Sequence, residues 1–192
     1  MPAPPRPDIP TLSELPLAIT TPHLRLRPVR EADAEALFEF TSDPEFSRYM
    51  TWAPHTDVEV TREWTRHCAT VLAAGSAIVW AMEHAGNVIG CVGLHGIVWQ
   101  VRALRLDRAE LGYWLGRPYW GRGFATEAAT AVTAWAFDTL GVHKVKVQCF
   151  EPNVGSQRVI EKCGFRFIGR TEEDVWRDGQ WHAHLEYERI RS

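Results

Sequence analysis

Two glycines, Gly121 and Gly123, separate a pattern typical of a strand from one typical of a helix. Residues 108–115 favour a strand, whereas small apolar residues recur at helical spacing over 125–140. Glycine lets the backbone turn tightly without a Cβ obstructing the inside of the turn. The N–H groups of such a turn converge at the helix N-terminus. They form a cradle suited to a phosphate or pyrophosphate, to which Arg122 could add a charge.

The glycine turn does not match the common nucleotide-binding motifs. No glycine follows Gly123 until Gly141, so the dinucleotide fingerprint GxGxxG is absent, and so is the P-loop pattern GxxxxGK[ST]. A nucleotide-triphosphate enzyme is therefore disfavoured. A turn that serves only packing and a turn that binds another nucleotide both remain alternatives at this point.

Seven strands and four helices are predicted along the chain. The expected strands cover residues 23–27, 76–84, 88–98, 108–115, 142–150, 165–175 and 181–190. The expected helices cover residues 30–42, 56–74, 125–140 and 153–163, and a loop is expected over 99–107. This order predicts an α/β (α+β) fold in which helices pack on a mixed sheet, within a single domain over 23–192.

The first 22 residues hold seven of the twelve prolines. Proline lacks the N–H donor and fixes φ, so this N-terminal arm is predicted to be neither a helix nor a central strand. We expect an extended arm on the surface, with completion of a subunit interface as the alternative. The arm lacks the basic start and apolar run of a secretory signal, and the four cysteines form no CxxC pair. The cysteines are therefore expected to be reduced and the protein cytoplasmic.

Charge and hydropathy narrow the possible partners. The chain carries 21 Lys and Arg against 24 Asp and Glu, a formal net charge of −3, so it has no global attraction to nucleic acid. No stretch approaches the roughly 18 apolar residues of a membrane helix. His182 and His184 share one strand face, but no third ligand accompanies them and no metal site is expected.

Five segments of the chain carry recognisable motifs. They read LRLRP followed by EAD within residues 24–33, IGCVGL at 89–94, AELGYWL at 109–115, YWGRGFATEA at 119–128 and NVGSQRVIEKCGF at 153–165. Together, over residues 21–190, they resemble the GNAT N-acetyltransferase superfamily, and more narrowly its Rim-type branch of ribosomal-protein N-terminal acetyltransferases and their relatives. The resemblance implies a mixed, mostly antiparallel sheet of about seven strands and about four flanking helices, with a splay between central strands.

The resemblance also implies an activity. The protein would be an acetyl-CoA-dependent N-acetyltransferase that moves an acetyl group to a primary amine, a protein N-terminus or a small amine, by direct attack in a ternary complex. No metal is implied, and because relatives are often monomers or dimers, the oligomeric state stays open, with a homodimer as one possibility. A catalytically silent acyl-CoA-binding or regulatory module on the same fold is the alternative.

The same resemblance assigns a cofactor site. Main-chain N–H groups would hold the pyrophosphate of acetyl-CoA at Trp120, Gly121, Arg122, Gly123, Phe124, Ala125 and Thr126. Backbone groups would pair with the pantetheine arm at Tyr113, Trp114 and Leu115. Asn153 would bond the pantetheine or phosphate side, with Arg158 in the same motif. Ser156 would lie near the thioester sulfur and protonate the departing thiolate, a role that some relatives give to a tyrosine where this chain has Ile160.

Amine acetylation also needs a base, and Glu110 is expected to supply it, directly or through a water. The alternative is that Glu110 pairs with Arg105 or Arg108 and only orders its strand. His95, on the neighbouring strand, is the second candidate, with a hydrogen-bonded rim residue as the structural alternative.

The acceptor side is expected to come from residues 43–56 and 99–107. There Trp52 and Trp99 either wall the cleft or simply pack. Four other tryptophans are expected to pack against the sheet or close the final hairpin: Trp80, Trp135, Trp176 and Trp181. Trp114 and Trp120 are expected to flank the cradle.

Overall fold

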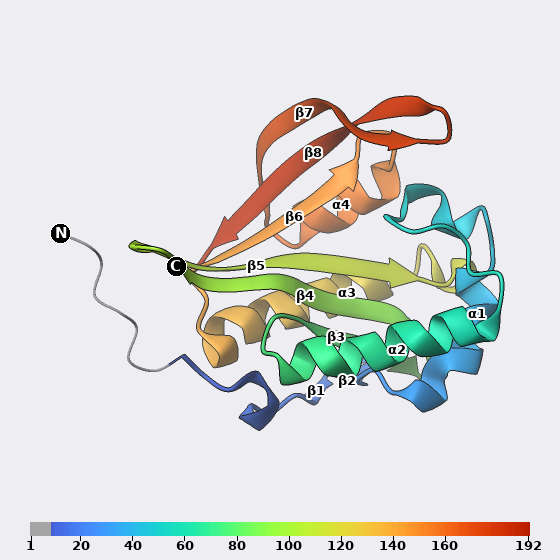
Figure 1. Cartoon of the computed structure of the whole chain (residues 1–192), viewed down its shortest axis with the longest axis horizontal. Coiled ribbons are helices and arrows are strands. Elements are labelled where there is room, and N and C mark those ends of the chain that lie inside the picture. Colours follow the sequence, from blue (N-terminus) through green and yellow to red (C-terminus); the bar gives the residue numbers. More distant parts are fainter. Residues whose placement is uncertain (1–8) are drawn as a thin grey trace.

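The computed structural model describes residues 9–192, which form one eight-stranded sheet with helices on both faces (Figure 1). The strand order is β1-β2-β3-β4-β5-β6-β8-β7, and every neighbouring pair is antiparallel except β5 and β6. The strands are β1 (Ile19–Thr20), β2 (Arg25–Pro28), β3 (Ile78–His84), β4 (Asn87–Val101), β5 (Leu104–Leu115), β6 (Lys144–Phe150), β7 (Arg166–Arg177) and β8 (Gln180–Ile190).

Four α-helices cover the two faces of the sheet. Helices α1 (Ala34–Thr41) and α2 (Val58–Ala73) lie on one face, and α3 (Phe124–Trp135) and α4 (Val154–Lys162) lie on the other (Figure 1). Single turns complete the order: η1 (Leu12–Glu14), η2 (Glu31–Asp33), η3 (Phe46–Tyr49), η4 (Arg117–Tyr119) and the π-turn η5 (Ala136–Leu140). Alternate residues of β3 enter different cores, Trp80 the core beside α3 and Val79 the core beside α1 and α2. The centre of the sheet is therefore buried on both faces.

All the predicted strands and helices are present, with two differences between prediction and structure. Strand β1 is additional, and its two residues are too few to produce a visible alternation. The prediction of a loop over 99–107 is wrong, because β4 continues to Val101 and pairs there with Leu104 of β5. The tight turn between these strands is made possible by the positive φ of Arg102, 53°.

Residues 9–22 of the proline-rich segment pack against the domain. Leu12 is buried, and β1 pairs with β2. Two indole N–H groups donate to carbonyls of this segment, Trp80 to Leu17 and Trp135 to Pro16. These two carbonyls do not pair with a neighbouring strand, so the indole N–H groups supply their hydrogen bonds. The rest of the predicted arm lies outside the described residues, and the domain boundary at residue 22 stays a prediction.

Tryptophans expected to pack or to close the hairpin behave in two ways. Trp80 and Trp135 are buried, with ring centroids 5.2 Å apart, as predicted. Trp176 and Trp181 meet across the β7–β8 hairpin at 5.5 Å, edge to face, but remain 59% and 53% exposed. They close the hairpin, but packing against the sheet is not found for this pair.

Strand β6 is paired with β5 only over the first part of β6. The register joins Arg108 to Lys144 at the start and Glu110 to Lys146 at the end. Beyond this point β5 follows β4 to Leu115 while β6 follows β8 to Phe150, and the two strands diverge (Figure 1). This confirms the splay implied by the sequence resemblance.

Candidate functional site

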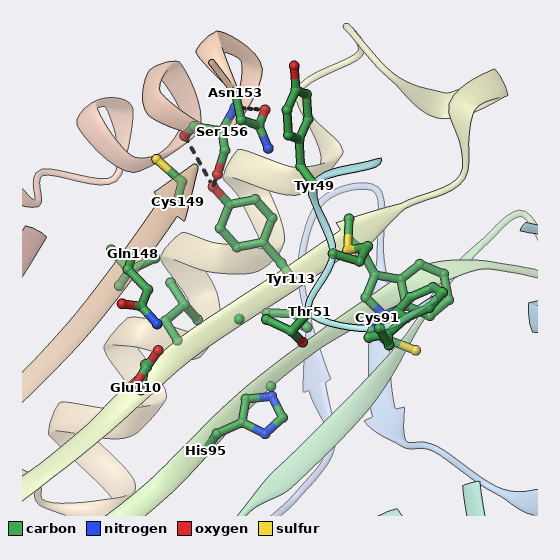
Figure 2. A pocket seen from close by; sticks show the side chains of 18 of the residues that line it. Tyr49, Thr51, Cys91, His95, Glu110, Tyr113, Gln148, Cys149, Asn153 and Ser156 are labelled. Atoms are coloured by element: carbon green, nitrogen blue, oxygen red, sulfur yellow. Dashed lines mark hydrogen bonds between the residues drawn. The ribbon is translucent and has the colours of Figure 1, made fainter. Parts of the chain in front are cut away.

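A cavity of about 400 Å³ opens where β5 and β6 part. Figure 2 shows side chains from both strands, from α4 and from the segment after η3 around it. Its walls include seven residues predicted for the site: Trp52, His95, Glu110, Tyr113, Trp114, Asn153 and Ser156. Trp99 is not brought to the cavity. It lies in β4 and packs against the core beside α3, so the expectation that it walls the acceptor cleft is wrong.

The cavity has two chemically different sides, which follow from strand alternation. In the β4–β5 register His95 lies opposite Glu110, and Val92 lies opposite Tyr113. Opposed residues share a face, and successive residues alternate between faces. Val92 belongs to the core beside α3, whereas Trp114 belongs to the core beside α1 and α2. The Tyr113 side chain therefore points toward α3 and α4, and those of Glu110 and His95 point toward α1 and α2.

On the α4 side, three polar groups form a connected set (Figure 2). The Tyr113 and Ser156 hydroxyl oxygens are 2.8 Å apart, and the Tyr113 hydroxyl also lies 3.2 Å from the Ser156 carbonyl oxygen. The Asn153 side-chain oxygen accepts the Ser156 N–H at 3.1 Å, which confirms Asn153 as the N-cap of α4. The hydroxyl of Tyr113 is an addition to the site, because the sequence resemblance assigned only its backbone.

Burial sets the protonation of this side. It raises the pKa of the Tyr113 phenol well above its usual value, so the phenol is a hydrogen-bond donor at neutral pH. Burial also raises the pKa of the neighbouring Cys149 thiol to about 11, against a smaller opposite effect of the Ser156 hydroxyl. A thiol in this state is a poor nucleophile. This side therefore offers proton donors and no reactive thiolate.

Glu110 is exposed and lines the cavity, and within residues 9–192 it forms no ion pair with Arg105 or Arg108. Arg105 instead pairs with Asp107, its Nε lying 2.5 Å from the carboxylate. Among the described residues no ion pair joins Glu110 to Arg108. The geometry therefore supports a role for the Glu110 carboxylate in the cavity over a role in ordering its strand.

His95 lies over two glycines beside Glu110. A Cβ at Gly93 would come 3.0 Å from His95 Nε2, and one at Gly112 would come 3.3 Å from the imidazole. Both glycines belong to motifs quoted above, and here they make room for the ring. Desolvation lowers the pKa of His95, so its imidazole is mostly neutral at pH 7 and able to accept a proton.

The α1 and α2 side is lined by aromatic rings. Trp114 contacts Trp52, Trp64 and Phe46, with centroid separations of 6.5, 6.3 and 5.3 Å. Tyr49 adds a ring that lies 5.9 Å from that of another wall residue, Phe150. The Trp114 side chain thus belongs to this wall, not to the cradle that it was expected to flank. Such a wall suits an apolar body that carries a polar group.

The glycine turn begins α3 as predicted. Gly121 and Gly123 have φ of +73° and +85°, values that favour glycine. The first main-chain bond of the helix runs from Glu127 N–H to the Gly123 carbonyl. The N–H groups before it, at Phe124, Ala125 and Thr126, are therefore the unpaired donors of a helix N-terminus. These three N–H groups are among those expected to hold the pyrophosphate, and their binding of an anion stays a prediction.

Trp120 departs from its predicted role in this cradle. Its backbone N–H donates to the Arg117 carbonyl at 3.1 Å, and its indole N–H donates to the Leu115 carbonyl. Neither donor is free, so the expectation that the Trp120 amide holds pyrophosphate is wrong. Arg122 lies nearby, with its guanidinium 4.7 Å from the centre of the Phe124 ring.

Residues 9–192 contain no group of three or more His, Cys, Asp or Glu residues suited to holding a metal ion. No helix in the same residues is long and apolar enough to span a membrane. Of the two histidines of β8, His182 has its Nε2 3.1 Å from the Arg177 carbonyl, and His184 has its Nδ1 2.9 Å from the Asp174 carboxylate.

Comparison with known proteins gives a family match over most of the chain. Residues 23–166 match the family model described as an acetyltransferase (GNAT) domain. The N-acetyltransferase p20 of Bacillus licheniformis is 30% identical over 151 residues, which are 78% of this chain and 82% of that protein. The N-acetyltransferase YoaA of Bacillus subtilis is 28% identical over 163 residues, covering 84% of this chain and 89% of the relative.

A solved structure shares the fold. RimL, described as a ribosomal L7/L12 alpha-N-protein acetyltransferase in complex with coenzyme A, superimposes with a TM-score of 0.81 at 21% identity. The match covers 90% of this chain and 97% of the RimL chain. At this identity the likeness concerns the fold.

Proposed function

The chain belongs to the GNAT acetyltransferase family and is an acetyl-CoA-dependent N-acetyltransferase, and we propose that it works through the splay between β5 and β6. The observation that carries this proposal is the cavity that joins two unlike sides. Tyr113 and Ser156 lie on one side, and Glu110 and His95 lie on the other. Acetyl-CoA binds on the α3 and α4 side, and the amine enters from the α1 and α2 side.

Three features of the chain fit acetyl-CoA. The N–H groups at the start of α3 suit its pyrophosphate. The edge of β5 after Glu110, including Tyr113 and Leu115, has no β6 partner and is open to the amides of the pantetheine arm. The Asn153 oxygen is engaged by Ser156, which leaves its NH₂ group to donate to the cofactor. Arg158, exposed on α4, is proposed to meet the phosphate side.

The residues divide the proton transfers between them. Bound acetyl-CoA supplies the thioester carbon and a thiolate leaving group. Glu110 accepts the proton that the amine loses as the C–N bond forms, directly or through a water, and His95 supports it as a neutral neighbour. Ser156 donates its hydroxyl proton to sulfur as the C–S bond breaks and regains a proton from solvent. The Tyr113 hydroxyl lies 2.8 Å from Ser156 Oγ and keeps that hydroxyl in place.

The acceptor is proposed to be a primary amine on an apolar body, a protein N-terminus or a small monoamine. Among the described lining residues Glu110 is the only carboxylate, and the surrounding wall is aromatic. Two acidic residues of β8, Glu186 and Glu188, lie on the same face of the sheet as Glu110. Both already form ion pairs, Glu186 with Lys146 and Glu188 with Lys144. A polyamine would need several free carboxylates. The fold neighbour RimL, described as acting on a protein α-amino group, supports the N-terminus.

Replacement of Glu110 by glutamine should lower kcat by about 10²-fold, because the amide cannot accept the proton. The dissociation constant of acetyl-CoA should stay within about twofold, since Glu110 lies on the other side of the cavity. The measurement is CoA release against a panel of N-terminal peptides, small monoamines and polyamines. Glu161→Gln, at an exposed position on α4, is the matched control.

An unchanged kcat in the Glu110→Gln variant would exclude Glu110 as the catalytic base. Tight acetyl-CoA binding by the wild-type protein without turnover on any acceptor would favour the silent acyl-CoA-binding module instead. Preference for polyamines over monoamines would contradict the proposed acceptor class while leaving the base intact.

A further inference from the structure

Arg177, the last residue of β7, is bonded to main chain about 130 residues away in sequence. Its guanidinium donates to the carbonyl oxygens of Ser47 at 2.9 Å, of Trp52 at 3.3 Å, and of Met50. The Arg177 side chain is only 17% exposed. One side chain from the hairpin thus binds three carbonyls of a single short segment.

The segment that Arg177 holds, residues 47–52, is part of the aromatic wall of the acceptor side. Tyr49, Met50 and Trp52 line the cavity, and they follow or end the single turn η3. Among the main-chain hydrogen bonds of the described residues, the Ser47 carbonyl accepts the Met50 N–H within η3, whereas none reaches the carbonyls of Met50 and Trp52. These two carbonyls therefore need donors from elsewhere. Arginine suits this task because its planar fork presents five N–H donors in fixed directions.

The hairpin end is itself fixed, so it can act as a support. Asp178 and Gly179 both have positive φ, 51° and 81°, as in a two-residue hairpin turn. Arg177 pairs with Gln180 across this turn, and its carbonyl is bonded by the His182 ring at 3.1 Å. The base of the Arg177 side chain is therefore held in register with β8.

We propose that Arg177 is a positioning residue for the acceptor: it latches the wall formed by residues 47–52 to the β7–β8 hairpin. The proposal rests on the acceptor side assigned under the proposed function. Arg177 touches no reacting atom and acts by fixing Tyr49 and Trp52. Without it, the wall has to be ordered each time an acceptor binds, which weakens binding. The acetyl-CoA side does not depend on it.

Kinetics of Arg177→Met and Arg177→Lys provide the test. Loss of hydrogen bonds to a charged donor should raise KM for the acceptor by about tenfold or more in Arg177→Met. Arg177→Lys should be intermediate, because an ammonium cannot span three carbonyls. KM for acetyl-CoA should stay within about twofold. Arg166→Met is the matched control, since Arg166 begins the same strand and pairs with Glu188.

A second readout does not require a known acceptor. Arg48 is exposed inside the latched segment, so trypsin should cut after it about tenfold faster in Arg177→Met than in wild type. Thermal melting shows whether each variant is folded. If Arg177→Met does not fold, the acceptor KM and the cleavage rate are read from Arg177→Lys instead. Equal rises in KM for both substrates, or an unchanged rate of cleavage at Arg48, would overturn the latch. If the wild-type protein acetylates no amine, the proposed acceptor class is wrong. The cleavage rate at Arg48 then still shows whether Arg177 fixes residues 47–52.

Discussion

Replacing Gly123 with valine should weaken acetyl-CoA binding by about 10²-fold or more, while the protein still folds. Gly123 has φ of +85° at the start of α3, a conformation that a β-branched residue strongly disfavours. A Cβ there would meet no described atom within 4 Å, so the effect comes from the backbone and not from crowding. Relief of the strain moves the turn and turns its N–H groups away from the pyrophosphate. Two lost charge-assisted hydrogen bonds are sufficient for the expected change.

Calorimetric titration of CoA and acetyl-CoA measures this effect. Gly75→Val is the matched control, because Gly75 has φ of +70°, also meets no atom within 4 Å, and follows α2 away from the cradle. Both variants should lose about 1–2 kcal/mol of stability through the same backbone strain. Only Gly123→Val should lose affinity. A folded Gly123→Val protein with wild-type affinity would move the cofactor site elsewhere.

Removing both hydroxyls of the Tyr113–Ser156 pair should lower kcat by about 10³-fold. Ser156→Ala removes the group proposed to protonate sulfur, and Tyr113→Phe removes the hydroxyl 2.8 Å from it. Each single variant should lose about 10²-fold, and the double variant less than the product, because the two groups act as one unit. Acetyl-CoA affinity should change little, because these bonds matter most when charge develops on sulfur.

Steady-state kinetics on the two single variants and the double variant measure the coupling. Tyr187→Phe is the control, because Tyr187 is a buried tyrosine of β8 that packs in the core. Additive losses would mean that the two hydroxyls work independently. Wild-type kcat in Ser156→Ala would show that sulfur is protonated by another group.

Local rules were sufficient for much of the fold. The GxG turn, the N-cap Asn153 and the strand patterns depend on near neighbours in sequence, and each is found where it was predicted. The 99–107 segment was misjudged, because its pairing depends on a hairpin whose tight turn is carried by Arg102 and not by glycine. Strand β1 is defined by its pairing with β2, and the segment before it is held by indole N–H groups that donate to Pro16 and Leu17; no local pattern reveals either contact.

The candidate site was predictable where it depends on sequence order and not where it depends on packing. Alternation along residues 108–115 separates Glu110 from Tyr113, so the two faces could have been inferred from the strand itself. The bond between Tyr113 and Ser156 joins residues 43 positions apart, and only the tertiary fold creates it. The same holds for Arg177. Trp99 was misplaced because an aromatic residue near a cleft and one in a core look alike in sequence.

A crystal structure of the CoA complex would show whether the splay between β5 and β6 holds the cofactor. The chain of CoA should enter the gap between these two strands. Its sulfur should then lie within about 3.5 Å of Ser156 Oγ or Tyr113 Oη, with its pyrophosphate on the amides that begin α3. Glu110 should lie across the splay from the sulfur. A sulfur atom outside this gap, or a pyrophosphate bound away from Gly121 and Gly123, would contradict the account.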